Sequence, residues 1–219
     1  MLLPSLIVDL DFPGHILVPA DGTNRSNQAL DAASAPLSLL YRVPAWVLRL
    51  ERRNGSGAIT AKELEAALPT ATRAAHVREQ PGVSPRALVI NALGSKTRFD
   101  EIRRRSVFLR RDAVEWIVSL GVKLLVSDVF ESDATPQDVF QTLFACGIIC
   151  VCNAVNLGVL PTTVTPTRPD ASRVELSCVP LATPGAVQCP VRLLAEVEPR
   201  AGGVVAADGV GSVQPSSRL

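Results

Sequence analysis

The side chains that could bind a metal ion lie in two distant parts of the chain. His15 and Asp21 are near the start, and Cys150 and Cys152 lie far downstream. The two cysteines are two residues apart, a spacing that places both thiols on one face of a strand. The sequence contains two histidines, His15 and His76, which excludes an ordinary multi-histidine metal site. Cys152 and His15 are therefore weak candidates for a thiolate and imidazole metal site.

A cysteine nucleophile would need a thiolate paired with a base. Cys152 with His15 or His76 could supply such a pair. A free cysteine within an apolar run more often packs as a small buried side chain, and we predict this for Cys152 and also for Cys146 and Cys189. The sequence has no G-x-S-x-G motif and no glycine-rich phosphate loop between a predicted strand and a helix. These patterns favour buried thiols over nucleophilic catalysis.

The composition limits the architecture and the partners. A chain of 219 residues with 47% hydrophobic content predicts one well-buried domain. We place this domain at residues 1–199 and predict a disordered tail at 200–219, where small and polar residues show no periodicity. The net charge is +1, and the arginines between 103 and 111 have acidic neighbours. Neither feature indicates a nucleic-acid partner.

The cysteines and the first ten residues bear on localisation. Five cysteines without a CxxC pair predict free thiols in a reducing compartment, either the cytoplasm or the interior of a reducing organelle. The opening segment is apolar, but it lacks a basic start and contains Asp9, so it predicts a strand and not a secretion signal. No run reaches the roughly 18 apolar residues that a membrane-spanning helix needs. We expect neither secretion nor membrane insertion.

Strand and helix patterns alternate along the chain. Thr60 and Glu63 form a capping-box pattern before a helix at 61–68, Asp112 is the predicted cap of a second helix, and Pro136 opens a third. Gly121 and Gly147 are predicted to end the last two of these helices. Predicted strands lie at 6–10, 16–18, 46–50, 88–90, 124–126, 148–152, 174–180 and 191–197. The alternation favours an α/β fold.

Four blocks in this order resemble the cyclase family, which includes bacterial kynurenine formamidases. The blocks are Arg86–Asn91, Asp112–Asp128, Cys146–Leu157 and Cys178–Arg192. They are similar to the family's strand before a T-G-W loop, its helix, turn and strand ending in aspartate, its G-x-x-x-x-E-N-L-x-N-L segment, and its closing A-L-P-L…S-P-V-R. The resemblance implies a single cyclase-like α/β domain with a mixed, barrel-like central sheet flanked by helices. It also implies a homodimer and a place among the metal-dependent hydrolases of tryptophan catabolism.

The residues that carry the family's chemistry are replaced. The signature H-x-G-T-H-x-D-x-P-x-H corresponds here to Ala20–Leu30, of which Gly22 and Thr23 are retained. By this resemblance the vestigial positions, which in the family hold metal ligands and a histidine for acid/base catalysis, are Ala20, Asn24, Ser26, Leu30, Phe140 and Cys152, and the signature's proline is Gln28. Zinc and manganese bind histidine and carboxylate groups, and these positions hold neither.

The leading interpretation is a non-catalytic, pseudoenzyme member of this family, without a cofactor, acting as a structural or regulatory subunit in a homodimer or a heteromeric assembly. The alternative is an arylformamidase-like hydrolase that uses zinc or manganese on C–N bonds other than peptide bonds, in N-formylkynurenine or a related cyclic or formyl amide. A third hypothesis is a module that binds a small ligand in the vestigial pocket. The retained Asp128, Ser132 and Asp133 are predicted to form a structural turn, and Trp46 and Trp116 to be core or interface aromatics.

Overall fold

The computed structural model describes residues 6–9, 15–17, 35–50, 57–68, 85–94, 107–131, 137–152, 154, 156–162, 173–180 and 188–198. The strands are β1 (Leu6–Asp9), β2 (His15–Leu17), β3 (Val43–Arg49), β4 (Gly57–Ile59), β5 (Ala87–Asn91), β6 (Val107–Leu109), β7 (Leu124–Ser127), β8 (Ile149–Cys152), β9 (Arg173–Pro180) and β10 (Gln188–Glu198). The helices are α1 (Ala61–Ala67), α4 (Arg111–Ser119) and α5 (Val139–Ala145), with short 3₁₀ helices η1 (Leu37–Leu39) and η2 (Leu157–Val159).

Eight of these strands form one mixed sheet that curls into a nearly closed barrel. Strands β3, β5, β7 and β8 are parallel neighbours, and β2, β9 and β10 join them in antiparallel pairs. The order is β1-β10-β2-β8-β7-β5-β3-β9. The last strand in this order, β9, also pairs with the second, β10, and this pairing closes the sheet on itself. The predicted α/β fold with a mixed, barrel-like sheet flanked by helices is confirmed.

Two apolar cores lie on the two faces of the parallel strands. Alternate residues such as Val47, Val89 and Val126 fill the inside of the barrel together with the inward residues of β9 and β10. Their chain neighbours pack on the outside against α1, α4 and α5. Because both faces are covered, β5, β7 and β8 are buried along their whole length, as expected for parallel strands.

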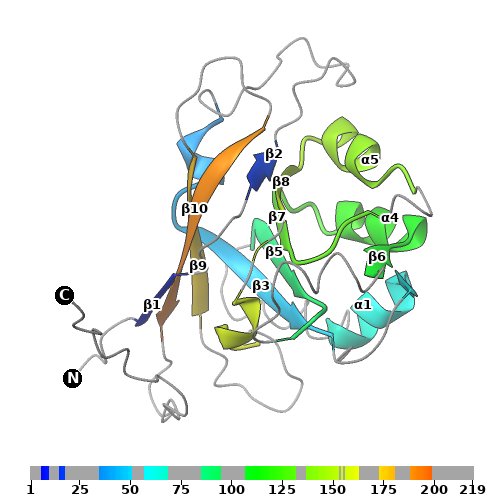
Figure 1. Cartoon of the computed structure of the whole chain (residues 1–219), viewed down its shortest axis with the longest axis horizontal. Helices are drawn as coiled ribbons and strands as arrows, with labels where there is room; N and C mark the ends of the chain where they lie inside the picture. Colours follow the sequence, from blue (N-terminus) through cyan, green and yellow to red (C-terminus); the bar gives the residue numbers. More distant parts are fainter. Residues whose placement is uncertain are drawn as a thin grey trace, which may run out of the picture.

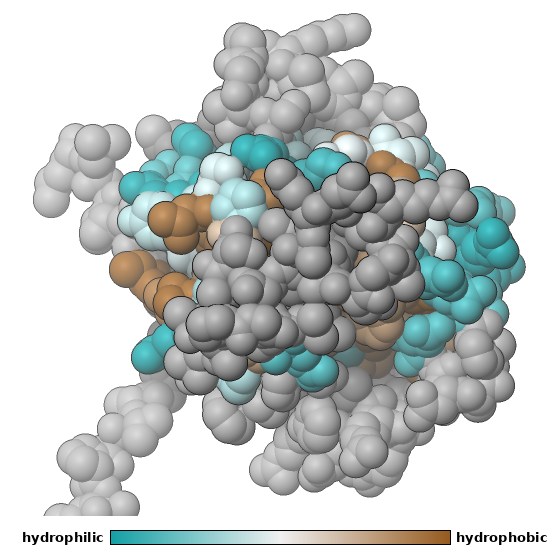
Figure 2. Space-filling view, turned by 90° about the horizontal axis from the view of Figure 1, so that it is seen from above, coloured by the Kyte–Doolittle hydropathy of each residue, from teal (hydrophilic) through white to brown (hydrophobic). Residues whose placement is uncertain are grey.

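Strands β9 and β10 differ because the helices lie on the opposite side of the barrel (Figure 1). Residues of β10 alternate between buried and exposed or half-buried positions along the strand. Their outer face carries ion pairs, including Arg42 with Glu175 at 2.7 Å and Arg173 with Glu175 at 2.6 Å. Figure 2 shows that hydrophobic residues also reach the surface on this side, which is the left in both views.

Local signals account for several element boundaries. Thr60 Oγ1 accepts a hydrogen bond from the Glu63 N–H, and the Glu63 carboxylate accepts one from the Thr60 N–H, so the predicted capping box is confirmed. Gly121 and Gly147 have φ values of +72° and +68°, which lie in the left-handed region that glycine adopts easily. Both glycines end helices as predicted.

The predicted helix starts are corrected, and several strand pairings were not predicted. Helix α4 begins two residues earlier than predicted, with Arg110 and not Asp112 at the cap, and Asp112 lies inside its first turn. Helix α5 begins later than the predicted opening at Pro136, at Val139 after the cap residue Asp138. The first two strands each pair with β10, which no local pattern indicated. The sequence also gave no signal for the parallel pair formed by β4 and β6, because strands of three residues show no periodicity. The predicted tail at 200–219 lies outside the described residues.

Candidate functional site

The vestigial positions fall into two groups. Phe140 and Cys152 are described in full, and the backbone of His15 is described. The positions Ala20, Asn24, Ser26, Gln28 and Leu30, together with Asp21, Ser132, Asp133 and His76, lie outside the described residues. The geometry of the candidate site therefore rests on the carboxyl ends of β5, β7 and β8 and on α5.

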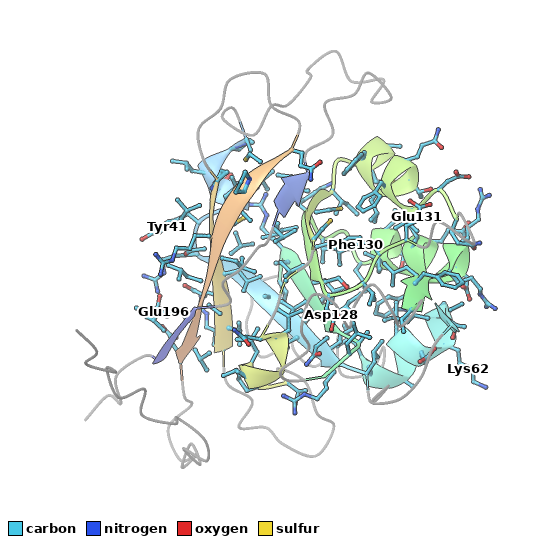
Figure 3. All side chains as sticks on the ribbon, in the orientation of Figure 1. Tyr41, Lys62, Asp128, Phe130, Glu131 and Glu196 are labelled. Carbon is cyan, nitrogen blue, oxygen red and sulfur yellow. The ribbon has the colours of Figure 1, made fainter. Side chains whose placement is uncertain are left out.

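Phe140 lies in a run of three aromatic rings. Its ring is stacked on Phe130, with centroids 5.2 Å apart and planes 18° apart, and it contacts Phe144 at 5.8 Å. Phe144 is four residues along α5, so both rings project from the same side of that helix. Figure 3 shows Phe130 between the barrel strands and the helices. The position that resembles the family's helix histidine thus belongs to an apolar layer without a donor atom.

Cys152 ends β8 in the same outer core. The residue is 7% exposed, and burial raises the pKa of its thiol well above the ordinary value. Cys150 lies on the same face, as predicted, and its pKa is raised by burial and by the neighbouring Cys152. Both thiols therefore stay protonated at neutral pH, which disfavours them as nucleophiles.

The sheet brings together the two weak metal candidates. His15 is the register partner of Cys152 in the antiparallel pair of β2 and β8, and Leu17 is the partner of Cys150. Within the described residues, no group of three or more His, Cys, Asp or Glu side chains could hold a metal ion. The register thus places the backbones of His15 and Cys152 side by side on neighbouring strands.

The retained aspartate has a clear structural contact. Asp128 directly follows β7, and its carboxylate accepts hydrogen bonds from the Ala92 N–H at 2.9 and 3.1 Å and from the Leu93 N–H at 2.9 Å. Asp128 is 3% exposed. Figure 3 shows it at the end of the parallel strands. Its carboxylate ties the turn after β7 to the loop after β5, which matches the structural role predicted for it.

Two other buried polar side chains at this edge were missed. The Ser127 hydroxyl donates to the Val129 carbonyl at 2.7 Å and accepts from the Val129 N–H at 3.1 Å. Asn91 Oδ1 accepts from the Gly94 N–H at 2.9 Å, and Asn91 is fully buried. The signal was available, since each is a polar residue at the end of an apolar strand. The carboxyl edge of parallel strands is where α/β proteins usually bind ligands.

The remaining cysteines carry no site. None of the five cysteines, all of which lie in the described part of the chain, forms a disulfide. Cys178 and Cys189 are buried inside the barrel, and burial together with Cys189 raises the pKa of Cys178 to about 12. Cys146 is exposed, which corrects the expectation that it is buried, because it caps the end of α5 and does not lie in a strand. In the described part of the chain, no helix is long and apolar enough to cross a membrane.

The tryptophans occupy the positions expected of core aromatics. Trp46 is 5% exposed and belongs to the outer core. Trp116 packs against the same core from α4, and its indole N–H donates to the Glu65 carboxylate of α1 at 2.8 Å. The hydrogen bond of Trp116 joins α4 to α1.

No protein-family model matches this sequence, and no curated protein matches it at a significant level. Solved structures do match its fold. An isatin hydrolase bound to the product analogue thioisatinate is 17% identical, with 84% of this chain and 71% of that chain covered and a TM-score of 0.60. Isatin hydrolase A from Labrenzia aggregata, bound to benzyl benzoate, is 14% identical over 90% of this chain and 85% of its own, with a TM-score of 0.62.

A potential metal-dependent hydrolase with cyclase activity is also similar, at 16% identity over 84% of this chain and 77% of its own, with a TM-score of 0.51. At these identities the likeness concerns the fold. It agrees with the resemblance found in the sequence blocks, and it extends over 84% to 90% of this chain. The chain therefore has the cyclase-like fold found in metal-dependent hydrolases.

Proposed function

We propose that this chain is a non-catalytic cyclase-like protein, a pseudoenzyme related to the kynurenine formamidases, that acts as a structural or regulatory subunit. The observation that carries the proposal is the stack of Phe140 between Phe130 and Phe144. A metal-binding histidine in the family's pattern corresponds to this position. An aromatic ring packed between two others fills the space with apolar contacts and offers no ligand.

Cys152, at the end of β8, supports the same proposal. It replaces a glutamate of the family pattern, and its buried thiol has a raised pKa. A hard divalent metal with an open water position is normally held by histidine and carboxylate groups. Neither Phe140 nor Cys152 fits that requirement, so we assign no catalytic step to zinc or manganese here. The residues at Ala20, Asn24, Ser26 and Leu30 add further replacements by sequence alone.

A subunit role is supported by the surface opposite the helices. The Leu40 carbonyl accepts a hydrogen bond from the Cys178 N–H at 2.7 Å. The next residues along each segment, Tyr41 and Val179, are therefore near each other, and their side chains are 64% and 56% exposed. Exposed apolar groups beside ion pairs suit contact with another protein. The partner would be a second copy or a different subunit. Five free thiols fit a cytoplasmic or reducing organelle location.

The test is a hydrolysis assay with reconstitution. The purified chain would be incubated with zinc or manganese and supplied with N-formylkynurenine or isatin, with and without a chelator. The proposal expects the same rate as the uncatalysed reaction in every arm. A chelator-sensitive rate above that background would overturn it. Size measurement by light scattering on the same sample would show whether the chain assembles.

The alternative is a metal-dependent amide hydrolase of the arylformamidase or cyclase type. The observation in its favour is the fold, because similar structures are isatin hydrolases and a potential metal-dependent hydrolase. In this case the ligands would come from positions other than those assigned by the family pattern. Metal-dependent turnover that survives Cys152→Ser would favour this alternative and would place the metal elsewhere.

A further inference from the structure

One buried polar group at the mouth of the barrel has an unused hydrogen-bond donor. Asn91 follows Ala87 and Val89 on the inner face of β5, and it is fully buried. The Gly94 N–H donates to Asn91 Oδ1 at 2.9 Å, which fixes the orientation of the amide. Within the described residues Asn91 Nδ2 has no hydrogen-bond partner. Buried amide donors are nearly always paired, so this one points to an absent acceptor.

A cation lies beside this donor on the neighbouring strand. Arg49 is the register partner of Asn91 in the parallel pair of β3 and β5, and it follows Val47 on the same inner face. Its guanidinium donates to the carbonyls of Gly158 and Leu160, at 2.8 and 3.1 Å. The two side chains thus present donors on the same face of adjacent strands.

The short helix η2 covers this mouth. Leu157 and Leu160 are buried in the inner core, and Asn156 enters the helix with a φ of +60°, in the left-handed region. Arg49 is the side chain that joins η2 to the edge of the sheet, and it does so through neutral carbonyl acceptors. A carboxylate is a stronger acceptor for a guanidinium than a carbonyl is. An anion could therefore displace the two η2 carbonyls from Arg49, which leaves the burial of Leu157 and Leu160 to hold η2 in place.

We propose that this mouth of the barrel is a binding site for a carboxylate with an apolar body. One carboxylate oxygen accepts from Asn91 Nδ2 and the other from Arg49, which releases the carbonyls of η2. The apolar body then covers the surface that Leu157 and Leu160 leave when η2 lifts. One planar group thus offers an acceptor oxygen to each of the two side chains. The site uses none of the positions on which the loss of catalysis was argued, so the two proposals can fail separately.

The probe is benzoate, with benzamide as a neutral analogue of the same shape. Benzoate would be titrated into isotopically labelled protein, and the Asn91 side-chain NH₂ and Arg49 Nε–H resonances would be followed by NMR. We expect saturable shifts with benzoate and none with benzamide. Arg49→Gln and Asn91→Asp should each weaken benzoate binding about tenfold to hundredfold, the effect of losing a hydrogen bond to a charged group.

Arg111→Gln is the matched control, because Arg111 is an exposed arginine on α4 whose partner is Glu115. It should bind benzoate like the unmodified chain. Asn91→Asp changes a buried residue, so if that variant does not fold, the exposed Arg49→Gln decides the result. Equal binding by Arg49→Gln and Arg111→Gln would overturn the proposal. So would equal binding of benzamide, the absence of benzoate binding, or a crystal structure grown with benzoate that shows only water at Asn91 Nδ2.

Discussion

The carboxyl ends of β7 and β8 are neighbours in the sheet, yet their chemistry is opposite. After β7, the Asp128 carboxylate is buried and accepts three hydrogen bonds from backbone amides. At the end of β8, Cys152 is a buried thiol in the outer apolar core, to which Phe140 of α5 also belongs. The side chain that binds the backbone amides is polar, whereas the two positions that the sequence resemblance associates with chemistry are apolar. Selection on folding without selection on catalysis would produce this difference.

The largest effect on stability is expected at Asp128, the polar residue after β7. Asp128→Ala leaves the buried Ala92 and Leu93 amides without an acceptor, and we expect it to lower the free energy of unfolding by about 3–4 kcal/mol. Urea unfolding followed by circular dichroism would measure this loss. Asp138→Asn is a suitable control, because Asp138 is exposed, makes no capping hydrogen bond and has a φ of 53° that asparagine tolerates. A loss below about 1 kcal/mol for Asp128→Ala would contradict the assigned role.

The apolar cluster around Phe140 should be destabilised when Phe140 is replaced by histidine, the residue that the family pattern has at this position. Phe140→His removes ring contacts with Phe130 and Phe144 and places a polar imidazole in the core, so we expect a loss of about 2 kcal/mol. Phe140→Leu, which keeps the apolar character, should lose less. The same unfolding assay with and without zinc distinguishes the non-catalytic proposal from the metal-dependent hydrolase alternative. Stabilisation of the histidine variant by zinc would show that a metal site survives at this corner.

A smaller change in the free energy of unfolding is expected at Thr60, which is remote from Asp128 and Phe140 and serves as a reference. Thr60→Ala removes one of the two reciprocal bonds of the capping box, which should lower the free energy of unfolding by about 1 kcal/mol. Thr60→Ser keeps the hydroxyl and should be close to neutral. If Thr60→Ala lowered the free energy of unfolding as much as Asp128→Ala, Asp128 would contribute no more to stability than an ordinary helix cap.

The smallest effect concerns acid stability. A hydrogen bond from Arg110 is the main cause that lowers the pKa of Asp112 from 3.8 to about 2, and the Ala61 N–H adds to it. A carboxyl with a lowered folded-state pKa stabilises the protein above its unfolded pKa, and this contribution is lost as the pH falls through the folded pKa. The Asp112 side chain is 37% exposed, so solvent screening limits the contribution to less than about 1 kcal/mol.

Unfolding measured between about pH 5 and pH 2 would test this assignment. Asp112→Asn should be less stable than the unmodified chain at the upper end, and the difference should disappear toward pH 2. A difference that is constant over the whole range would mean that the charge of Asp112 is not involved.

Local sequence signals predicted much of the fold. The Thr60 and Glu63 capping box, the turns at Gly121 and Gly147, and the apolar parallel strands were predicted because each depends on residues close in the chain. The missed features depend on distant residues. The β4 and β6 pair and the bond from Arg49 to Gly158 are not visible in a local pattern. Arg110 at the start of α4 was missed because Asp112 has the more typical capping side chain.

The candidate site could be predicted only in part. The replaced positions at Phe140 and Cys152 followed from the resemblance, and their burial among apolar groups follows from the structure. The role of Asp128 was anticipated from its type, but the backbone N–H groups that donate to it lie 35 and 36 residues away. Asn91 was read as the end of a strand, because the sequence does not show which buried donors lack an acceptor.

Metal content per chain, measured by plasma mass spectrometry on dialysed protein, tests the central claim most directly. The account predicts folded protein with far less than one zinc or manganese ion per chain, whether or not metal was added before dialysis. Retention of close to one equivalent of either ion would contradict it and would support a working metal-dependent hydrolase.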